Sequence, residues 1–182
     1  MAKTADILRF QTPLHRPAEP ADADWLFLRV PADASAQLGT RSMVSVEGSF
    51  ARQPLLATLQ PDGEGGHWLK VEKALCEAAG VAAGDRVQLQ VSRAAVEPEP
   101  EVPDDLATAL AGHPAALATW RDITAVARRD WIAWVTSGRK AETRAKRIGV
   151  ACDKLGKGQR RACCFDRSGM FDKSLHAPTP AR

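Results

Sequence analysis

The sequence predicts an α+β protein in which a β-barrel domain precedes a small α-helical bundle. Apolar residues recur at about every second position in short segments up to residue 95, and at steps of three and four after residue 106. These are the periods of strands and of helices. Between them, residues 96–105 contain three prolines and five acidic side chains, a composition that favours a linker. We therefore expect a barrel over 1–95, a linker over 96–105, helices over 106–161 and a partly disordered tail over 162–182.

The first domain contains five short segments with the alternation typical of strands. They are bounded by Gly, Pro and Asp, which favour turns. The segments are DWLFLRV, RSMVSVEGSF, PLLATLQ, HWLKV and RVQLQV. Two short helical segments lie among them, so the domain is expected to be mainly β with two helical insertions.

An imperfect internal repeat relates the two halves of this domain. VPADASAQLG (30–39) aligns without a gap on VEKALCEAAG (71–80), a period of 41 residues. A strand segment follows each copy, and the second is reached through four extra residues. The pattern predicts strand, short helix, glycine stop and strand, twice over.

The second copy, LKVEKALCEAAGVAAGDRVQLQV, resembles the swapped-hairpin module of AbrB and MazE type proteins. The resemblance implies a pseudo-duplicated, double-split β-barrel, formed within one chain instead of by a dimer. Proteins of this type bind DNA, which requires a basic surface. In the second copy, however, acidic side chains balance the basic ones, so a scaffold or a protein-binding surface is favoured. The balanced residues are Lys70, Lys73 and Arg86 against Glu72, Glu77 and Asp85.

The net charge of +3 conceals a strongly basic C-terminal third. Residues 1–95 carry a net charge of −1 and residues 96–105 of −5, whereas residues 121–182 carry 15 basic and six acidic side chains, a net charge of +9. Electrostatic attraction of a partner is therefore expected from the C-terminal third. No apolar run approaches the roughly 20 residues of a membrane span, and the first residues lack the pattern of a signal peptide. We expect a cytoplasmic protein.

Four helices are predicted in the second domain: DDLATALAG, PAALATWRDI, TAVARRDWIAWVTS and RKAETRAKRIGVACDKL. Trp131 and Trp134 lie three residues apart in the third helix, near one side, and we expect them to belong to the core. In the fourth helix a stripe of apolar residues is expected to be buried: Ala141, Ala145, Ile148, Cys152 and Leu155.

Five bases occupy the rest of the fourth helix, and they are the candidate anion- or partner-binding residues: Arg139, Lys140, Arg144, Lys146 and Arg147. Glu142 precedes Lys146 by four residues, the orientation that favours an ion pair. The other bases have no acidic neighbour along the helix. They form either a solvated face, paired in part with the acidic linker, or a ridge that binds an anionic partner.

The sequence identifies no catalytic, cofactor-binding or metal-binding residues. KLGKGQRR lacks the spacing of a P-loop, and the four histidines are scattered. Cys152, Cys163, Cys164 and His176 could surround a zinc ion but lack paired C-x2-C spacing. The vicinal Cys163 and Cys164 lie among arginines, which would lower a thiol pKa. We expect fraying beyond His176.

The chain as a whole resembles the bacterial YdeI/OmpD-associated family, in the form where a β-barrel domain of unknown function precedes the helices. The resemblance covers residues 5–161 and is carried by DWLFLRVPADASAQLG, GHWLKVEKALCEAAGVAAGDRVQLQV, VPDDLATAL and DWIAWVTSGRKAETRAKRI. It implies a role in protection against bacteriocins or cationic peptides and association with an outer-membrane porin. It implies no reaction, and no catalytic residues are carried over.

These observations favour a non-enzymatic cytosolic binding protein of a bacterial envelope or antimicrobial-peptide stress response, whose basic ridge recognises an acidic partner. One alternative is a nucleic-acid-binding regulator that uses the AbrB-like barrel and the basic helix. Another is an enzyme with a site between barrel and helices. The sequence indicates neither the partner nor the oligomeric state.

Overall fold

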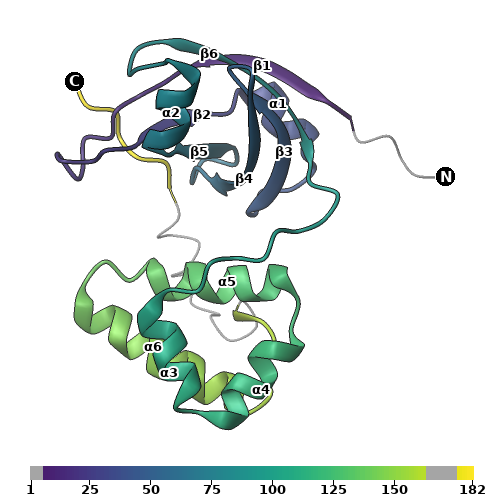
Figure 1. Ribbon diagram of the computed structural model, residues 1–182, viewed down its shortest axis with the longest axis vertical. Helices are drawn as coiled ribbons and strands as arrows, with labels where there is room; N and C mark the ends of the chain where they lie inside the picture. Colours follow the sequence, from purple (N-terminus) through teal and green to yellow (C-terminus); the bar gives the residue numbers. More distant parts are fainter. Residues whose placement is uncertain (1–5, 163–175) are drawn as a thin grey trace. The chain divides into compact units, whose positions relative to one another are not determined.

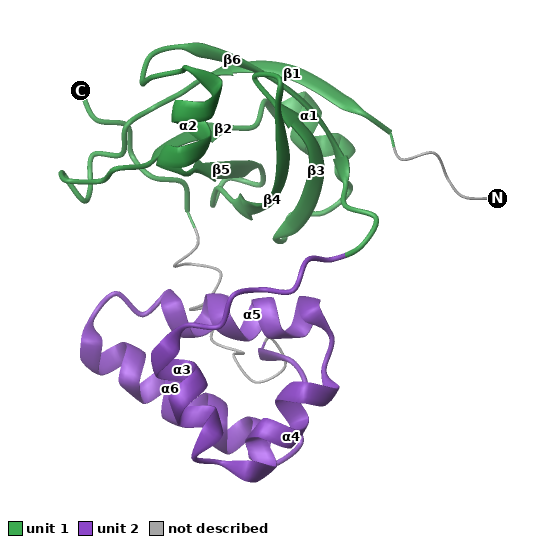
Figure 2. Ribbon diagram, in the orientation of Figure 1, with its two compact units in different colours: residues 1–96, 175–182 green, residues 97–174 purple. Residues whose placement is uncertain are grey.

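A computed structural model describes residues 6–162 and 176–182. The chain forms two compact units, one of residues 1–96 with 175–182 and one of residues 97–174 (Figure 2). Unit 1 contains all the named strands, and unit 2 is helical. The structure thus confirms the α+β class, with the β domain first.

Unit 1 is a nearly closed antiparallel barrel (Figure 1). Its strands follow the order β1-β6-β3-β4-β5-β2, and every pair is antiparallel. The two end strands meet where the hydroxyl of Thr12 donates to the Arg29 carbonyl oxygen at 2.9 Å. The elements are β1 (Leu8–Pro13), β2 (Leu26–Arg29), α1 (Ala32–Gln37), β3 (Val44–Phe50), β4 (Gln53–Pro61), β5 (His67–Val71), α2 (Lys73–Ala79) and β6 (Arg86–Arg93).

The internal repeat is visible in the strand pairing. β2-α1-β3 and β5-α2-β6 follow the predicted order, and β2 pairs with β5 while β3 pairs with β6. Leu28 lies opposite Leu69, its equivalent 41 residues later, and Glu47 lies opposite Ser92, its equivalent after the four-residue insertion. Equivalent residues therefore face each other in both pairs, which is the arrangement of a pseudo-two-fold axis. Whether the barrel is of the AbrB type stays a prediction.

Strand β1 is the one strand of unit 1 that we did not predict. Its segment, LRFQTP, buries Leu8 and Thr12 and pairs along its whole length with β6. Of its two buried side chains, Leu8 is apolar and Thr12 is polar. The Thr12 hydroxyl can be buried because it donates a hydrogen bond to the Arg29 carbonyl oxygen. The apolar alternation was therefore too weak to indicate a strand.

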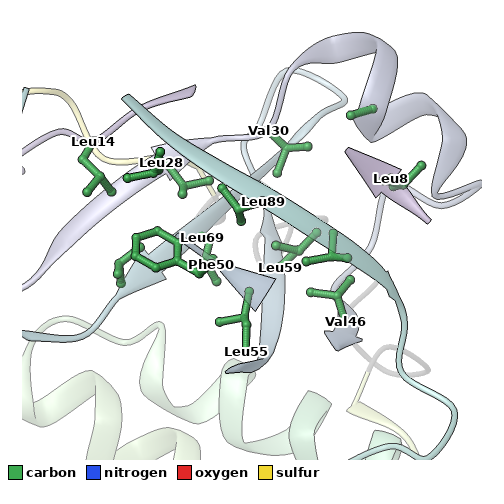
Figure 3. Close-up of a cluster of buried hydrophobic side chains, with 14 of the residues drawn as sticks. Leu8, Leu14, Leu28, Val30, Val46, Phe50, Leu55, Leu59, Leu69 and Leu89 are labelled. Carbon is green, nitrogen blue, oxygen red and sulfur yellow. The ribbon is translucent and has the colours of Figure 1, made fainter. Parts of the chain in front are cut away.

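The barrel interior is filled by aliphatic and aromatic side chains from most of the strands (Figure 3). Strand β6 shows the alternation clearly: Val87, Leu89 and Val91 are buried, whereas the residues between them are exposed. Phe50, Leu69 and Leu89 lie together in the centre (Figure 3) and expose at most 2% of their surface. Burial of each such side chain contributes about 1.5–3 kcal/mol.

The β3–β4 hairpin has a strained two-residue turn. Phe50 pairs with Gln53, and the intervening Ala51 and Arg52 have φ angles of 45° and 72°. Two successive positive φ angles define a type I′ turn, for which Asn-Gly is the favoured sequence. Left-handed backbone costs an L-residue roughly 1–2 kcal/mol, so neither Ala nor Arg is the choice that the turn alone would favour.

A buried polar pair joins α1 to β5. The Ser35 hydroxyl lies 2.6 Å from Nδ1 of His67, and His67 Nε2 lies 3.0 Å from the Ser42 carbonyl oxygen. Because a carbonyl can only accept, Nε2 carries the proton and Nδ1 accepts from Ser35. His67 is completely buried, so the pair secures the helix to the barrel and is not accessible to a substrate.

The C-terminal residues 176–182 belong to unit 1. Ala177 is buried beside Phe27 and Trp68, and its N–H donates to the Asp62 carbonyl oxygen at 3.0 Å. The Ala18 N–H donates to the carbonyl of Thr179 at 2.7 Å, and the Ala181 N–H to that of Arg16 at 2.8 Å. The predicted fraying beyond His176 is therefore wrong, because backbone pairing holds this segment. The earlier part of the tail lies outside the described residues.

Unit 2 contains the four predicted helices: α3 (Asp104–Ala111), α4 (Pro114–Asp122), α5 (Ala125–Thr136) and α6 (Ala141–Gly156). Local signals start two of them. Pro114 occupies the first turn of α4, where a missing N–H costs nothing. The Thr124 hydroxyl accepts from the Ala127 N–H at 3.2 Å and caps α5.

Both tryptophans of α5 lie in the core, as predicted. Trp131 is fully buried and Trp134 is 8% exposed, and their rings meet edge to face at 6.1 Å between centroids. From α6, Ile148, Ala151, Cys152 and Leu155 join the same core. Ala141 and Ala145, however, are exposed, so the predicted stripe is wrong for the first turns of α6. An alanine methyl is small enough to be tolerated on either face.

Candidate anion-binding surface

The five candidate bases lie at the start of α6, which follows a tight loop after α5. Gly138 fits closely into this loop: a Cβ atom there would lie 3.2 Å from the Arg144 backbone nitrogen and 3.2 Å from Cγ2 of Thr143, so a larger residue would require a small local shift. The first turn of α6 is thereby held against the end of α5. The structure divides the five bases into two that are paired within unit 2 and three that are not.

Arg144 is paired with Asp105, in the first turn of α3. Its Nε and Nη2 donate to the two carboxylate oxygens at 2.6 and 3.0 Å, a bidentate geometry. The Arg144 hydrogen bond holds the pKa of the Asp105 carboxyl below its usual range, and the same bond raises the pKa of Arg144. The two side chains are 33% and 44% exposed, so solvent screening keeps the contribution small.

Arg147 points back toward the end of α5. Its Nη1 donates to the Trp134 carbonyl oxygen at 2.6 Å and to the Ser137 hydroxyl. The guanidinium carbon also lies 5.3 Å from the centroid of the Trp134 ring, within reach of a cation–π interaction. A cation here satisfies a terminal carbonyl and complements the negative end of the α5 dipole. Arg147 is therefore a structural residue, and the prediction that it faces outward is wrong.

Arg139, Lys140 and Lys146 remain exposed, and we call them the three exposed cations. Within the described part of the chain none of the three side chains has a hydrogen-bond or ion-pair partner. Glu142 does not pair with Lys146, contrary to the sequence-based prediction. Lys140 and Lys146 are six residues apart, about 9 Å along a helix and about 120° around it, so a segment that meets both would have to cross the end of α6.

The acidic linker neutralises a different helix. The Glu99 carboxylate accepts two hydrogen bonds from Arg128, at 2.5 and 2.7 Å, and Glu97 forms an ion pair with Arg129. Both arginines belong to α5. Arg128 also donates to the carbonyl oxygens of Trp120 and Ile123 at 3.0 and 2.5 Å. Of the five candidate bases, only Arg144 is paired with the predicted linker, through Asp105. The linker acids thus leave the three exposed cations uncompensated.

The local electrostatics favour an anion at this end of α6. Lys140 is the N-cap residue, and its side chain makes no capping hydrogen bond. The N-terminus of a helix carries a partial positive charge and unsatisfied N–H groups. Three cations at such an end repel it and one another; Glu142, in the first turn of α6, offsets part of this repulsion, and a bound carboxylate or phosphate would relieve more of it.

The described residues offer little to covalent or metal chemistry. They contain no group of three His, Cys, Asp or Glu side chains that could hold a metal ion. Burial raises the pKa of both Cys76 and Cys152, which keeps them as weakly nucleophilic thiols. Cys163 and Cys164 lie outside the described residues, so the lowered thiol pKa expected for that pair stays a prediction, and the described residues do not test the zinc site that the cysteine spacing disfavours.

Comparison with known families agrees with this two-unit arrangement. Residues 99–158 match the family described as bacteriocin-protection, YdeI or OmpD-associated, and residues 10–91 match a domain of unknown function, DUF1905. The helical unit is thus the part of the chain that matches the YdeI/OmpD-associated family. The family match includes all three exposed cations, and the DUF1905 match covers most of the barrel. No curated protein matches the chain. None of the described helices is both long and apolar enough to cross a membrane.

Proposed function

We propose that this chain is a non-enzymatic binding protein whose helical unit recognises an acidic segment of a partner protein through Arg139, Lys140 and Lys146. One observation carries the proposal: the other two bases of the segment are engaged in structural contacts, whereas these three have no counterion among the described residues. Uncompensated cations accelerate encounter with an acidic partner and orient it.

The family description supports a place for this binding in protection against bacteriocins, and the cytosolic location remains part of the proposal. A basic surface repels a cationic peptide, so it would not capture such a peptide directly. The partner is therefore a component of the cell with an acidic, exposed segment. A nucleic acid is less favoured, because within residues 6–162 and 176–182 no exposed aromatic side chain accompanies the three cations for base stacking.

Affinity capture from a bacterial lysate tests the proposal. The full chain and a variant with Arg139→Glu, Lys140→Glu and Lys146→Glu would be crosslinked at low salt, and the captured proteins identified by mass spectrometry. The three side chains have no partner among the described residues, so the variant is expected to fold normally. Reversal of Arg144 or Arg147 would instead disrupt contacts with Asp105 and Trp134.

A charge-matched control is available in unit 1, where Arg41, Arg86 and Arg93 are also exposed. Reversal of these three to Glu changes the net charge equally and leaves α6 intact. We expect the wild type and the control to capture the same acidic protein and the α6 variant to lose it. Equal capture by all three proteins would refute the proposal, and capture of nucleic acid alone would favour the alternative regulator.

A further inference from the structure

A second candidate site lies on the outer wall of unit 1, at the turn between β3 and β4. A hollow of about 290 Å³ is present there, beside the end of α2. The residues that line it are Ser49, Ala51, Arg52, Ala79, Gln88 and Gln90. The volume is near the lower end of the range for small-molecule sites.

The sheet holds the lining residues in a fixed arrangement. Gln88 and Gln90 occupy exposed positions on β6, on either side of the buried Leu89. Ser49 lies opposite Gln90 in the β3–β6 pair, which makes their side chains neighbours on one face. The Ala51 N–H donates to the Gln88 carbonyl oxygen at 2.9 Å and ties the turn to β6. The hollow is thus built on paired strands and not on a long loop.

The polar side chains of the hollow are unused by the fold. The guanidinium of Arg52, the amides of Gln88 and Gln90, and the Ser49 hydroxyl make no hydrogen bond or ion pair within the described residues. Some bases of unit 1 are paired, for example Lys70 with Glu72 at 2.9 Å. Arg52 shares its lack of a partner among the described residues with the exposed Arg41 and Arg86, but it alone of the three lines the hollow. Four converging polar groups, one of them cationic, are therefore available to a ligand.

The strained turn is a second, independent observation. Ala51 and Arg52 both have left-handed φ angles, although neither is glycine. Glycine at the second position would form the same turn with less strain. Such strain is found preferentially at binding sites, where it fixes a side chain in place. A type I′ turn does not itself favour an arginine at this position. A ligand that binds the guanidinium would account for the arginine.

We propose that this hollow binds a small molecule that bears an oxyanion, either a carboxylate or a phosphate. The guanidinium of Arg52 presents paired N–H donors that match such a group. The two amides and the hydroxyl bind further polar groups of the ligand, and the methyl groups of Ala51 and Ala79 contact its apolar part. This site is in unit 1 and does not depend on the three exposed cations.

Nuclear magnetic resonance titration of the full chain tests the site with two probes, succinate and inorganic phosphate, at constant ionic strength. We expect saturable shifts of the Ala51, Arg52, Gln88 and Gln90 amides with at least one probe, and the responding probe identifies the oxyanion. Arg52→Gly should weaken binding by about tenfold or more and yet raise the melting temperature, because it relieves the strained turn.

Arg41→Gly is the matched control, since it removes an exposed arginine of unit 1 that does not line the hollow. It should leave the binding of both probes unchanged. The proposal is wrong if neither probe gives saturable shifts up to about 10 mM, ten times the usual upper limit for metabolite affinities. It is also wrong if Arg52→Gly binds the probes as tightly as the wild type.

Discussion

The guanidinium of Arg147 joins α6 to the end of α5, with Nη1 2.6 Å from the Trp134 carbonyl oxygen and the guanidinium carbon 5.3 Å from the centre of the Trp134 ring. One side chain therefore satisfies a helix-terminal carbonyl and covers a core aromatic ring. The basic character of this position serves the stability of unit 2, while its neighbour Lys146 faces solvent.

Arg147→Ala should lower the free energy of unfolding by about 1–3 kcal/mol, because it removes a charged hydrogen bond and a cation–π contact. Urea unfolding followed by tryptophan fluorescence measures the change. Lys146→Ala, one residue away, should change stability by less than about 0.5 kcal/mol. Equal effects of the two substitutions would contradict the structural role of Arg147.

The Arg144–Asp105 pair should contribute little, and in a pH-dependent way. We expect a double-mutant cycle with Arg144→Gln and Asp105→Asn to give about 0.2–1 kcal/mol near neutral pH. Because the folded pKa of Asp105 is lowered, the pair stabilises above the ordinary carboxyl pKa of about 3.9 and is lost as the pH falls through the lower, folded value. A coupling energy that grows toward acid pH would contradict this assignment.

The buried Ser35–His67 bond offers a sharp comparison between two serines. Ser35→Ala leaves Nδ1 of a fully buried histidine without a donor and should cost about 1–3 kcal/mol. Ser42→Ala should cost almost nothing, because His67 uses the backbone carbonyl of Ser42 and not its side chain. Thermal unfolding of both variants checks the prediction, and similar melting temperatures would show that the bond contributes nothing.

Docking of residues 176–182 should stabilise unit 1 by about 1–3 kcal/mol, from three backbone hydrogen bonds and the burial of Ala177. Ala177→Glu would place a charge against Phe27 and Trp68, release the segment and red-shift the tryptophan emission. Ala181→Glu, at an exposed position of the same segment, is the control. Unchanged emission in Ala177→Glu would show that the segment does not cover Trp68.

Most of the architecture could be predicted from the sequence, because the positions of strands and helices depend on local patterns of apolar residues. The five predicted strands lie where apolar residues recur at about every second position, the 41-residue repeat is preserved as Leu28 opposite Leu69, and two helices of unit 2 begin near Pro114 and Thr124. Strand β1 was missed because Thr12, a polar residue, takes one of its buried positions.

The roles of the individual bases could not be predicted, because they depend on contacts between distant residues. Arg144 meets Asp105, 39 positions away, and Arg147 reaches the end of the preceding helix. Periodicity places all these bases on the polar side of α6 but does not indicate which have partners. The strained turn at Ala51 and Arg52 gives no sequence signal either, since turns of its type are expected to contain Asn or Gly.

The most direct test of the central proposal is a calorimetric titration of the captured acidic partner with the wild type, the α6 triple variant and the unit 1 control. We predict that Arg139→Glu with Lys140→Glu and Lys146→Glu weakens the affinity by at least about tenfold at roughly 0.1 M salt and reduces its salt dependence, while the control retains at least half of the wild-type affinity. An α6 variant that binds within a factor of about two of the wild type would contradict the proposal.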